Sequence, residues 1–487
     1  MPETAKPLDL LIVGAGISGI SAACYLAQQC PDKNYTILEA RDDIGGTWDL
    51  FRYPGIRSDS DMHTFGFDFK PWTNPKALAD GPSIKAYLNE AIDEYGVRNN
   101  IQFGVKVVSA NWKDDESEWL VTVKDHEGDE QNLRTRVLFM CSGYYNYDHG
   151  YTPDFPGIEK FQGEVIHPQH WPENLDYTGK KVVVIGSGAT AVTLVPAMAD
   201  KAERITMIQR SPTYIVSRPG EDGLAKFLNR ILPPKVAYWL VRWRNIRFQN
   251  LVYKRSRTNP QKMREQILHL VRKELGEEYP IERDFTPSYN PWDQRLCLVP
   301  DADLFKAIKS GKAQVVTGEI DHITESGVKM KSGELVETDI LVTATGLELQ
   351  LFGGVKFYQD GEEISFPSHF TYQGMMVSDV PNLVWTFGYI NASWTLRADL
   401  NSQFVCEMFQ HMDATGTNRF VPRLKEEEKD MPQTSWVQDF NPGYMQRGLH
   451  QFPKQGDHQP WHNTQNYLLD RKLLKKGLAD DGVLQFQ

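Results

Sequence analysis

The fold of this chain is most clearly indicated by the stretch Leu10-Leu-Ile-Val13-Gly14-Ala-Gly16-Ile-Ser18-Gly19. An apolar run that leads into G-x-G-x-x-G is typical of a buried parallel strand, a tight turn and a helix, which we expect over residues 17–29. The glycines let the backbone approach a pyrophosphate, and the helix N-terminus faces the phosphates with partial positive charge. The next expected strand, residues 35–38, ends in Glu39, where a carboxylate can hold a ribose 2′-hydroxyl. We predict a dinucleotide site formed by Gly14, Gly16, Ser18, Gly19 and Glu39.

A second unit repeats this layout. A strand is expected over residues 182–185 and another over 204–208, and the loop between them is Gly186-Ser187-Gly188-Ala189-Thr190-Ala191. The position that matches Glu39 is the neutral Gln209, and Arg210 and Ser211 follow it. A carboxylate would repel a 2′-phosphate, whereas a guanidinium pairs with one. The first unit therefore suits FAD and the second NADPH rather than NADH, the alternative for Arg210 being an exposed arginine at a strand end.

The bulk composition is that of an ordinary globular protein, and 487 residues suffice for two or three domains. The net charge of −11 argues against nucleic acid as a partner, because phosphate binding needs a basic field. The five cysteines are scattered, without a C-x-x-C pair, which indicates reduced thiols. Because residues 1–7 are mostly polar and no apolar stretch has the length of a membrane span, we expect a cytoplasmic protein.

The two units predict an α/β fold with two Rossmann-like domains. We expect the first part of the FAD domain at residues 1–150, the NADP domain at 151–345, and the second part of the FAD domain with the C-terminal region at 346–487. Residues 339–346 form an expected strand and small-residue turn, suited to a crossover between the domains. The strand expected at 105–108 would bring Val107 to the adenine.

Paired glycines followed by a bulky aromatic suit a loop that passes close to a flat cofactor. This pattern occurs at Gly45-Gly46-Thr47-Trp48, so we assign Gly46, Thr47 and Trp48 to the cofactor site. The alternative for Trp48 alone is a core residue.

Residues 220–290 interrupt the alternation of strands and helices with long helical patterns. Between Lys235 and Arg257 every charged side chain is basic, and Trp239, Leu240, Trp243 and Ile246 recur at helical spacing. Such a helix can lie on a membrane surface. We favour a packed helical insertion in the NADP domain with a solvated charged face, because such a helix needs a hydrophobic stripe in either case.

The segment that joins the two units contains Phe161, Gly163, His167, Trp171 and Pro172 at the spacing F-x-G-x3-H-x3-W-P. This segment and the run from Gly45 to Asp59 resemble two signatures of the type I Baeyer–Villiger monooxygenases, which belong to the flavin-containing monooxygenase superfamily. The resemblance covers nearly the whole chain. Among the members of this family, the chain looks most similar to the mycobacterial ethionamide-activating FAD monooxygenases. Related N- and S-oxidising enzymes usually carry Tyr or Phe where Trp171 stands.

The resemblance implies an enzyme with non-covalent FAD that NADPH reduces. Oxygen then binds at flavin C4a as a peroxide, which attacks a ketone and yields an ester or lactone, with side activity on sulfides or thiocarbonyls. Arg295 would be the active-site arginine, supplying fixed positive charge to the transition state, and Asp59 would orient it. The lysine that commonly precedes this arginine is Gln294 here, so NADPH preference should depend more heavily on Arg210. The alternative for Arg295 is a structural ion pair.

Several alternatives stay open at this point. An N- or S-oxidising flavin monooxygenase would share the fold, and a flavin reductase without oxygenation would share both nucleotide sites. His167 could lock a hinge between the domains or merely pack there. We predict no metal site, because no further ligands lie near His167 and His170. Gly388 to Trp394 is expected on the flavin or substrate side, and Trp461 and Asn466 are hypothesised to cover the nicotinamide.

Overall fold

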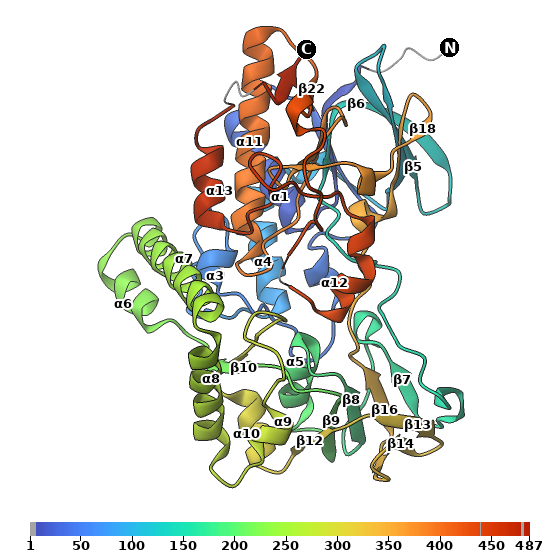
Figure 1. Cartoon of the computed structure of the whole chain (residues 1–487), viewed down its shortest axis with the longest axis vertical. Coiled ribbons are helices and arrows are strands. Elements are labelled where there is room, and N and C mark those ends of the chain that lie inside the picture. Colours follow the sequence, from blue (N-terminus) through green and yellow to red (C-terminus); the bar gives the residue numbers. More distant parts are fainter. Residues whose placement is uncertain (1–5, 439, 479–481) are drawn as a thin grey trace.

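The computed structural model describes residues 6–438, 440–478 and 482–487 (Figure 1). Figure 1 shows two lobes, the upper built around the first nucleotide unit and the lower around the second. Within the described residues no helix is both long and apolar enough to cross a membrane. All five cysteines are buried and free.

The upper lobe is built on a large sheet whose centre is the predicted first unit. β1 (Leu8–Val13) pairs in parallel with β2 (Tyr35–Glu39) and β6 (Glu130–Met140), and β2 pairs with β3 (Ile101–Phe103). β4 (Lys106–Lys113), β5 (Glu118–Lys124) and β6 continue the sheet antiparallel. Residues 10–13 of β1 are all buried, as expected for a strand covered on both faces.

Helices cover the centre of this sheet, and the most apolar of them is α1. α1 (Ile17–Gln29) packs against the long α11 (Trp394–Thr415), and α4 (Gly81–Glu94) lies beside it. The remaining short elements of the N-terminal part are α2 (Thr47–Leu50) and α3 (Met62–Phe65). The α1 bounds are those predicted from the sequence.

The lower lobe is built on a five-stranded parallel sheet with the order β12-β9-β8-β16-β7. Its strands are β7 (Glu164–Ile166), β8 (Lys181–Ile185), β9 (Arg204–Gln209), β12 (Ala313–Thr317) and β16 (Ile340–Thr343). α5 (Ala189–Met198) and α10 (Asp303–Lys309) pack beside each other. Short strands outside this sheet complete the lobe: β10 (Ile215–Arg218), β11 (Cys297–Pro300), β13 (Ile320–Thr324), β14 (Gly327–Met330) and β15 (Leu335–Glu337). Two sheets of this kind confirm the predicted α/β fold with two dinucleotide-binding folds.

After β16 the chain returns to the upper lobe. β17 (Lys356–Gln359) pairs with β4 and β18 (Glu362–Glu363), and β21 (Leu383–Trp385) adds a parallel strand beside β6. The C-terminal elements are β19 (Thr371–Tyr372), β20 (Met376–Val377), β22 (Phe420–Pro422), α12 (Gly443–Gly448), α13 (Tyr467–Leu474) and β23 (Leu484–Phe486). The exact boundaries at residues 150 and 346 stay a prediction.

The insertion is helical, as its sequence pattern indicates. It comprises α6 (Gly223–Ile231), α7 (Pro234–Thr258), α8 (Pro260–Leu275) and α9 (Ile281–Asp284). α8 packs against β10 and α10 of the lower lobe, whereas α7 packs against α3 of the upper lobe. The insertion therefore bridges the two lobes instead of belonging to the lower one alone.

Candidate functional site

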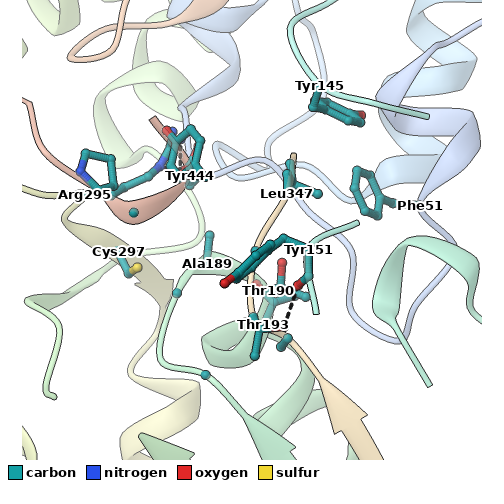
Figure 2. Close-up of a pocket in the computed structure, with 18 of the residues that line it drawn as sticks. Phe51, Tyr145, Tyr151, Ala189, Thr190, Thr193, Arg295, Cys297, Leu347 and Tyr444 are labelled. Carbon is teal, nitrogen blue, oxygen red and sulfur yellow. Dashed lines mark hydrogen bonds and ion pairs between the residues drawn. The ribbon is translucent and has the colours of Figure 1, made fainter. Parts of the chain in front are cut away.

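A cavity of about 1010 Å³ is lined by the glycine-rich loops of both units (Figure 2). Both loops follow the carboxyl ends of parallel strands, where open α/β sheets bind their ligands. The predicted residues that line it are Gly16, Ser18, Gly46, Thr47, Trp48, Asp59, Gly186, Ser187, Gly188, Ala189, Thr190, Arg210, Ser211 and Arg295. Residues far apart in the sequence therefore meet around one space large enough for extended ligands.

The first loop has the close contacts that a pyrophosphate cradle requires. Gly14 has a φ of +103°, and a Cβ there would lie 2.7 Å from the Cys141 carbonyl oxygen. A Cβ on Gly19 would lie 1.9 Å from the Gly14 carbonyl oxygen, so only glycine lets α1 approach the strand so closely. Gly16 lies at the N-terminus of α1, where backbone N–H groups are free to bind an anion.

Glu39 is buried at the end of β2. Its Oε2 accepts a hydrogen bond from the Ala15 backbone N–H at 2.8 Å, and its Oε1 accepts one from the Arg41 N–H at 3.0 Å. Burial raises the pKa of Glu39, and these two hydrogen bonds oppose the shift. The carboxylate thus fixes the glycine-rich loop, and its remaining lone pairs can accept a ribose hydroxyl.

The loop after the first unit lies over the same cavity. Gly46 begins α2 with a φ of +55°, and a Cβ there would lie 3.2 Å from the Gly16 Cα. The Thr47 hydroxyl lies 2.7 Å from the Tyr145 hydroxyl, and the half-buried Trp48 packs edge-on against Phe65. Trp48 therefore contacts both the core and the cavity.

The second loop shares the left-handed first glycine of the first loop, although Ala191 stands where the first loop has Gly19. Gly186 has a φ of +134°, and a Cβ there would lie 2.2 Å from the Ala344 carbonyl oxygen. Gly188 lies at the N-terminus of α5, and a Cβ there would meet nothing within 4 Å. The Ser187 hydroxyl lies 2.9 Å from the Thr213 hydroxyl, which joins this loop to the segment after β9.

Arg210 and Ser211 are exposed at the end of β9, beside the second loop. Gln209 occupies the strand-end position that Glu39 has in the first unit, but its Nε2 donates to the Asp284 carbonyl at 2.7 Å and to the Thr317 hydroxyl at 2.9 Å. The side chain that corresponds to Glu39 is thus turned into the protein, and a positive side chain next to it faces the cavity.

Arg295 and Asp59 form an ion pair across 236 positions of sequence. The Arg295 Nη2 and Nε atoms donate to Asp59 Oδ2 at 2.5 and 3.1 Å. Asp59 raises the pKa of Arg295 well above its usual range, so the guanidinium stays charged at every working pH. The Arg295 side chain is 40% exposed, and it is exposed into the cavity.

The inserted helix α7 holds the segments that carry both members of this pair. Asn245 and Gln249 donate to the Asp61 carboxylate at 2.9 and 2.8 Å, two residues beyond Asp59. Arg257 pairs with Asp293 at 2.6 Å, two residues before Arg295. These contacts fix the loops on either side of the ion pair.

Sequence reasoning missed the tyrosines around this pair. Figure 2 shows Tyr444 beside Arg295, and burial raises the pKa of Tyr444 above its usual value. Tyr144 stacks on Trp394 with ring centroids 5.2 Å apart, and the Trp394 indole donates to the Ser18 hydroxyl at 2.7 Å. Tyr144 directly follows Gly143 at the end of the first sheet, and Tyr444 lies in α12; no motif in the sequence marked either residue.

Some predicted residues lie away from the cavity. The Val107 side chain is buried in the sheet of the upper lobe, and Ala191, in the first turn of α5, packs into the core of the lower lobe. Trp461 is fully buried against Phe370 and Tyr372, so it does not cover the cavity, contrary to the hypothesis for the C-terminal tail. Asn466 caps α13 instead.

The fingerprint residues, which are Phe161, Gly163, His167 and Trp171 of the segment between the two units, lie at the joint between the lobes. His167 Nδ1 accepts from the Gln169 N–H at 3.2 Å, and its Nε2 therefore donates to the Gly346 carbonyl, also at 3.2 Å. A Cβ on Gly150 would lie 2.0 Å from the His167 ring. His167 thus contacts both chain crossings, residues 141–163 and 344–355. Gly346 lines the cavity, whereas the His167 side chain does not.

The other fingerprint residues have packing roles. A Cβ on Gly163 would lie 2.2 Å from the Asp339 carbonyl oxygen, where β7 meets β16. Phe161 and Trp171 are partly buried and pack against the two hydrophobic clusters of the lower lobe. The fingerprint therefore shapes the joint between the lobes.

The fold and the cavity define the class of protein as an α/β enzyme built from two dinucleotide-binding folds. The model of the flavin-binding monooxygenase-like family matches residues 8–275. The FAD-containing monooxygenase EthA of Mycobacterium tuberculosis is 52% identical over 480 residues, which cover 98% of this chain and 97% of that protein. The probable FAD-binding monooxygenase AlmA of Acinetobacter baylyi is 49% identical over 482 residues, with 99% and 96% covered.

Solved structures share the fold at lower identity. An oxidized steroid monooxygenase bound to NADP superimposes with a TM-score of 0.77 at 21% identity and covers 99% of both chains. A complex of OTEMO with FAD and NADP has a TM-score of 0.77 at 19% identity and covers 99% of this chain and 100% of that one. The chain belongs to the flavin-binding monooxygenase-like family.

Proposed function

We propose that this protein is an NADPH-dependent FAD monooxygenase that converts ketones into esters or lactones, the Baeyer–Villiger reaction. In this reaction one atom of O₂ enters the substrate next to its carbonyl carbon, the other leaves as water, and NADPH is oxidised to NADP⁺. Oxidation of sulfides or thiocarbonyls is a side activity of the same site. The observation that carries the proposal is the Arg295–Asp59 ion pair exposed in the cavity that both glycine-rich loops line.

The residues present fit the two cofactors. FAD would lie on the first loop, with its pyrophosphate at Gly14, Gly16 and Gly19, its ribose at Glu39 and its flavin toward Gly46 and Trp48. When bound, FAD accepts hydride from NADPH and activates oxygen. The close contacts at Gly14 and Gly19 and the N-terminus of α1 at Gly16 support this placement, because they bring backbone N–H groups close to where a pyrophosphate would lie.

NADPH would lie on the second loop, from Gly186 to Thr190. Arg210 supplies a positive charge for the 2′-phosphate, and Ser211 a hydroxyl beside it. Gln209 is engaged inside the protein and carries no charge, so nothing at this strand end repels a phosphate. Preference for NADPH over NADH follows from this arrangement.

Arg295 would act on the substrate. Negative charge develops on the ketone oxygen as the new carbon–oxygen bond forms, and a fixed guanidinium beside it stabilises that charge without reorganisation. Asp59 holds the guanidinium through its Nε and Nη2 atoms, so Nη1 takes no part in this ion pair. Aromatic side chains, among them Tyr144, Trp394 and Tyr444, line this part of the cavity, and bound substrate and cofactors would displace water from it.

A panel of ketones and matched sulfides tests the proposal. Purified FAD-loaded protein is incubated with NADPH and oxygen, and the products and the NADPH consumed are measured together. Ester or lactone from at least one ketone, in proportion to NADPH consumed, is the expected result. Oxidation of sulfides with no ester from any ketone would establish a heteroatom monooxygenase instead. NADPH oxidation to hydrogen peroxide with every substrate would point to a reductase.

A further inference from the structure

One segment of the insertion has a charge opposite to that of the whole chain. Residues 223–264 contain no Asp or Glu, whereas the chain has a net charge of −11. Their basic residues are Lys226, Arg230, Lys235, Arg242, Arg244, Arg247, Lys254, Arg255, Arg257, Lys262 and Arg264. The segment corresponds to α6, α7 and the start of α8, and Figure 1 shows α6 and α7 projecting from one side of the molecule, at the left of the view.

The apolar face of α6 is exposed. Leu224, Phe227 and Ile231 recur at helical spacing on one face and are 39%, 56% and 60% exposed, and in α6 only Ala225 is buried. A helix of a globular protein normally buries its apolar stripe. Here the stripe faces outward, so packing within the chain does not account for it.

The outer face of α7 continues this pattern. Val236, Trp239, Leu240 and Trp243 stand at positions i, i+3, i+4 and i+7 of one helical face, and each is between 37% and 53% exposed. Arg247 and Lys254 extend the same stripe toward the C-terminus, and the Arg247 guanidinium lies 4.2 Å from the centre of the Trp243 ring. Leu468 of α13, itself 39% exposed, borders one small hollow together with both tryptophans.

The opposite face of α7 is firmly held, so the outer face is a fixed surface. Arg242 is buried and donates to three backbone carbonyls around α3, those of His63, Thr64 and Gly66, at 3.0, 3.2 and 2.6 Å. It also pairs with the buried Asp399 at 3.2 Å. The inner face of α7 is therefore bound to the rest of the protein, while two tryptophans and several aliphatic side chains on its outer face are exposed to solvent.

We propose that the outer face of α6 and α7 docks on the surface of an anionic lipid bilayer. Aromatic and aliphatic side chains of such a helix pair enter the headgroup region, and Lys and Arg around them bind anionic headgroups. A second copy of this chain fits less well, because symmetric pairing of this face would set its basic residues against each other. The sequence alone favoured a packed helix with a solvated charged face; the exposed apolar residues argue for the membrane surface instead.

Vesicle co-sedimentation tests the proposal with the full-length, FAD-loaded protein. Vesicles of phosphatidylcholine alone are compared with vesicles that contain phosphatidylglycerol, each at low and at high salt. The charge variant is Lys235→Gln, Arg247→Gln and Lys254→Gln, three exposed residues of α7. Its matched control removes the same charge from the lower lobe by Lys180→Gln, Lys201→Gln and Lys309→Gln, which are equally exposed.

We expect binding to anionic vesicles that salt weakens. Each basic residue near an anionic surface strengthens binding about fivefold, so the charge variant should partition about 100-fold less well while the control binds like the unaltered protein. The double variant Phe227→Ser, Trp239→Ser should also bind anionic vesicles more weakly than the unaltered protein. All variants should keep the NADPH oxidation rate of the unaltered protein in solution, which shows that they are folded.

Three results would overturn the proposal. One is failure of the unaltered protein to bind anionic vesicles, and another is equal binding by the charge variant and its control. The third is self-association, measured by analytical ultracentrifugation, that is lost in the Phe227→Ser, Trp239→Ser variant while no vesicles bind; a second copy would then cover this face.

Discussion

The charge of Arg295 is the residue-scale feature on which the proposed reaction depends. In Arg295→Ala we expect NADPH to reduce the flavin still, because the second loop and Arg210 are unchanged, while ester formation falls at least about 100-fold, since a preorganised charge at the reacting oxygen is lost. Anaerobic stopped-flow reduction and product analysis measure the two steps separately. Arg295→Lys keeps the charge but not both contacts with Asp59, and should give an intermediate yield. A normal ester yield from Arg295→Ala would remove this residue from the mechanism.

Cofactor preference belongs to the residue scale as well. Arg210→Ala should raise the KM for NADPH about 10- to 100-fold and leave the KM for NADH unchanged, because one charge-assisted contact to the 2′-phosphate is lost. Gln294 also lines the cavity, and Gln294→Lys adds a charge there, so it should strengthen NADPH binding further. Initial rates with both nucleotides are the measurement. Equal changes for NADPH and NADH in Arg210→Ala would mean that Arg210 does not bind the 2′-phosphate.

The residues that the sequence revealed are those whose backbone or charge follows a pattern. Gly14, Gly186 and Glu39 were predictable because a tight turn and a strand-end acid have a regular spacing. The pairing of Arg295 with Asp59 was expected from a family resemblance, since no local pattern joins residues so far apart. Tyr444 was missed because it reaches the cavity from a C-terminal helix, and only the folded chain brings it there.

At the scale of elements, His167 connects the segments that join the two sheets. Burial lowers the pKa of His167, and its ring is neutral while Nδ1 accepts from Gln169 and Nε2 donates to Gly346. The folded pKa lies below the unfolded value of about 6.5, so the unfolded state binds more protons as the pH falls. The stabilisation by His167 is therefore fully present above about pH 6.5 and is lost as the pH falls toward the folded pKa.

His167→Gln tests this pH dependence, because glutamine keeps a hydrogen-bonding side chain but does not titrate. The fall in Tm from pH 7.5 to pH 5.5 should be smaller in His167→Gln than in the unaltered protein. His322→Gln, at an exposed histidine of the lower lobe, is the control and should leave the fall unchanged. The idea fails if His167→Gln and His322→Gln behave alike.

Elements were predicted well where one periodicity dominates. The α1 bounds and the central strands of both sheets follow from apolar runs and glycine spacing. The insertion was recognised as helical, but its bridging position was not, because the contacts of α7 with α3 and of α8 with β10 depend on tertiary packing. The short strands β17 and β21 were not predicted either, since a few residues at a sheet edge carry too little pattern.

At the scale of the whole molecule, the two chain crossings form a single joint. Backbone hydrogen bonds link them directly: Asn146 N–H to the Glu348 carbonyl at 2.8 Å, Tyr151 N–H to the Gly346 carbonyl at 3.0 Å, and Gln350 N–H to the Tyr144 carbonyl at 3.0 Å. The chain passes between the sheets here, and the cavity is lined from both sides of this joint. Any movement of one sheet relative to the other must therefore bend or shift these two paired segments.

NADP⁺ should stabilise this joint although it would bind mainly to the lower sheet. A ligand that contacts both walls of the cavity reduces the opening of the segments between them. In FAD-loaded protein, NADP⁺ should slow amide hydrogen exchange in residues 144–151 and 346–350 as well as in the second glycine-rich loop. His167→Gln removes one contact across the joint and should reduce the protection in those two segments but not in the loop. If NADP⁺ slows exchange in the second glycine-rich loop alone, bound NADP⁺ does not stabilise the two segments that join the lobes, and this prediction is wrong.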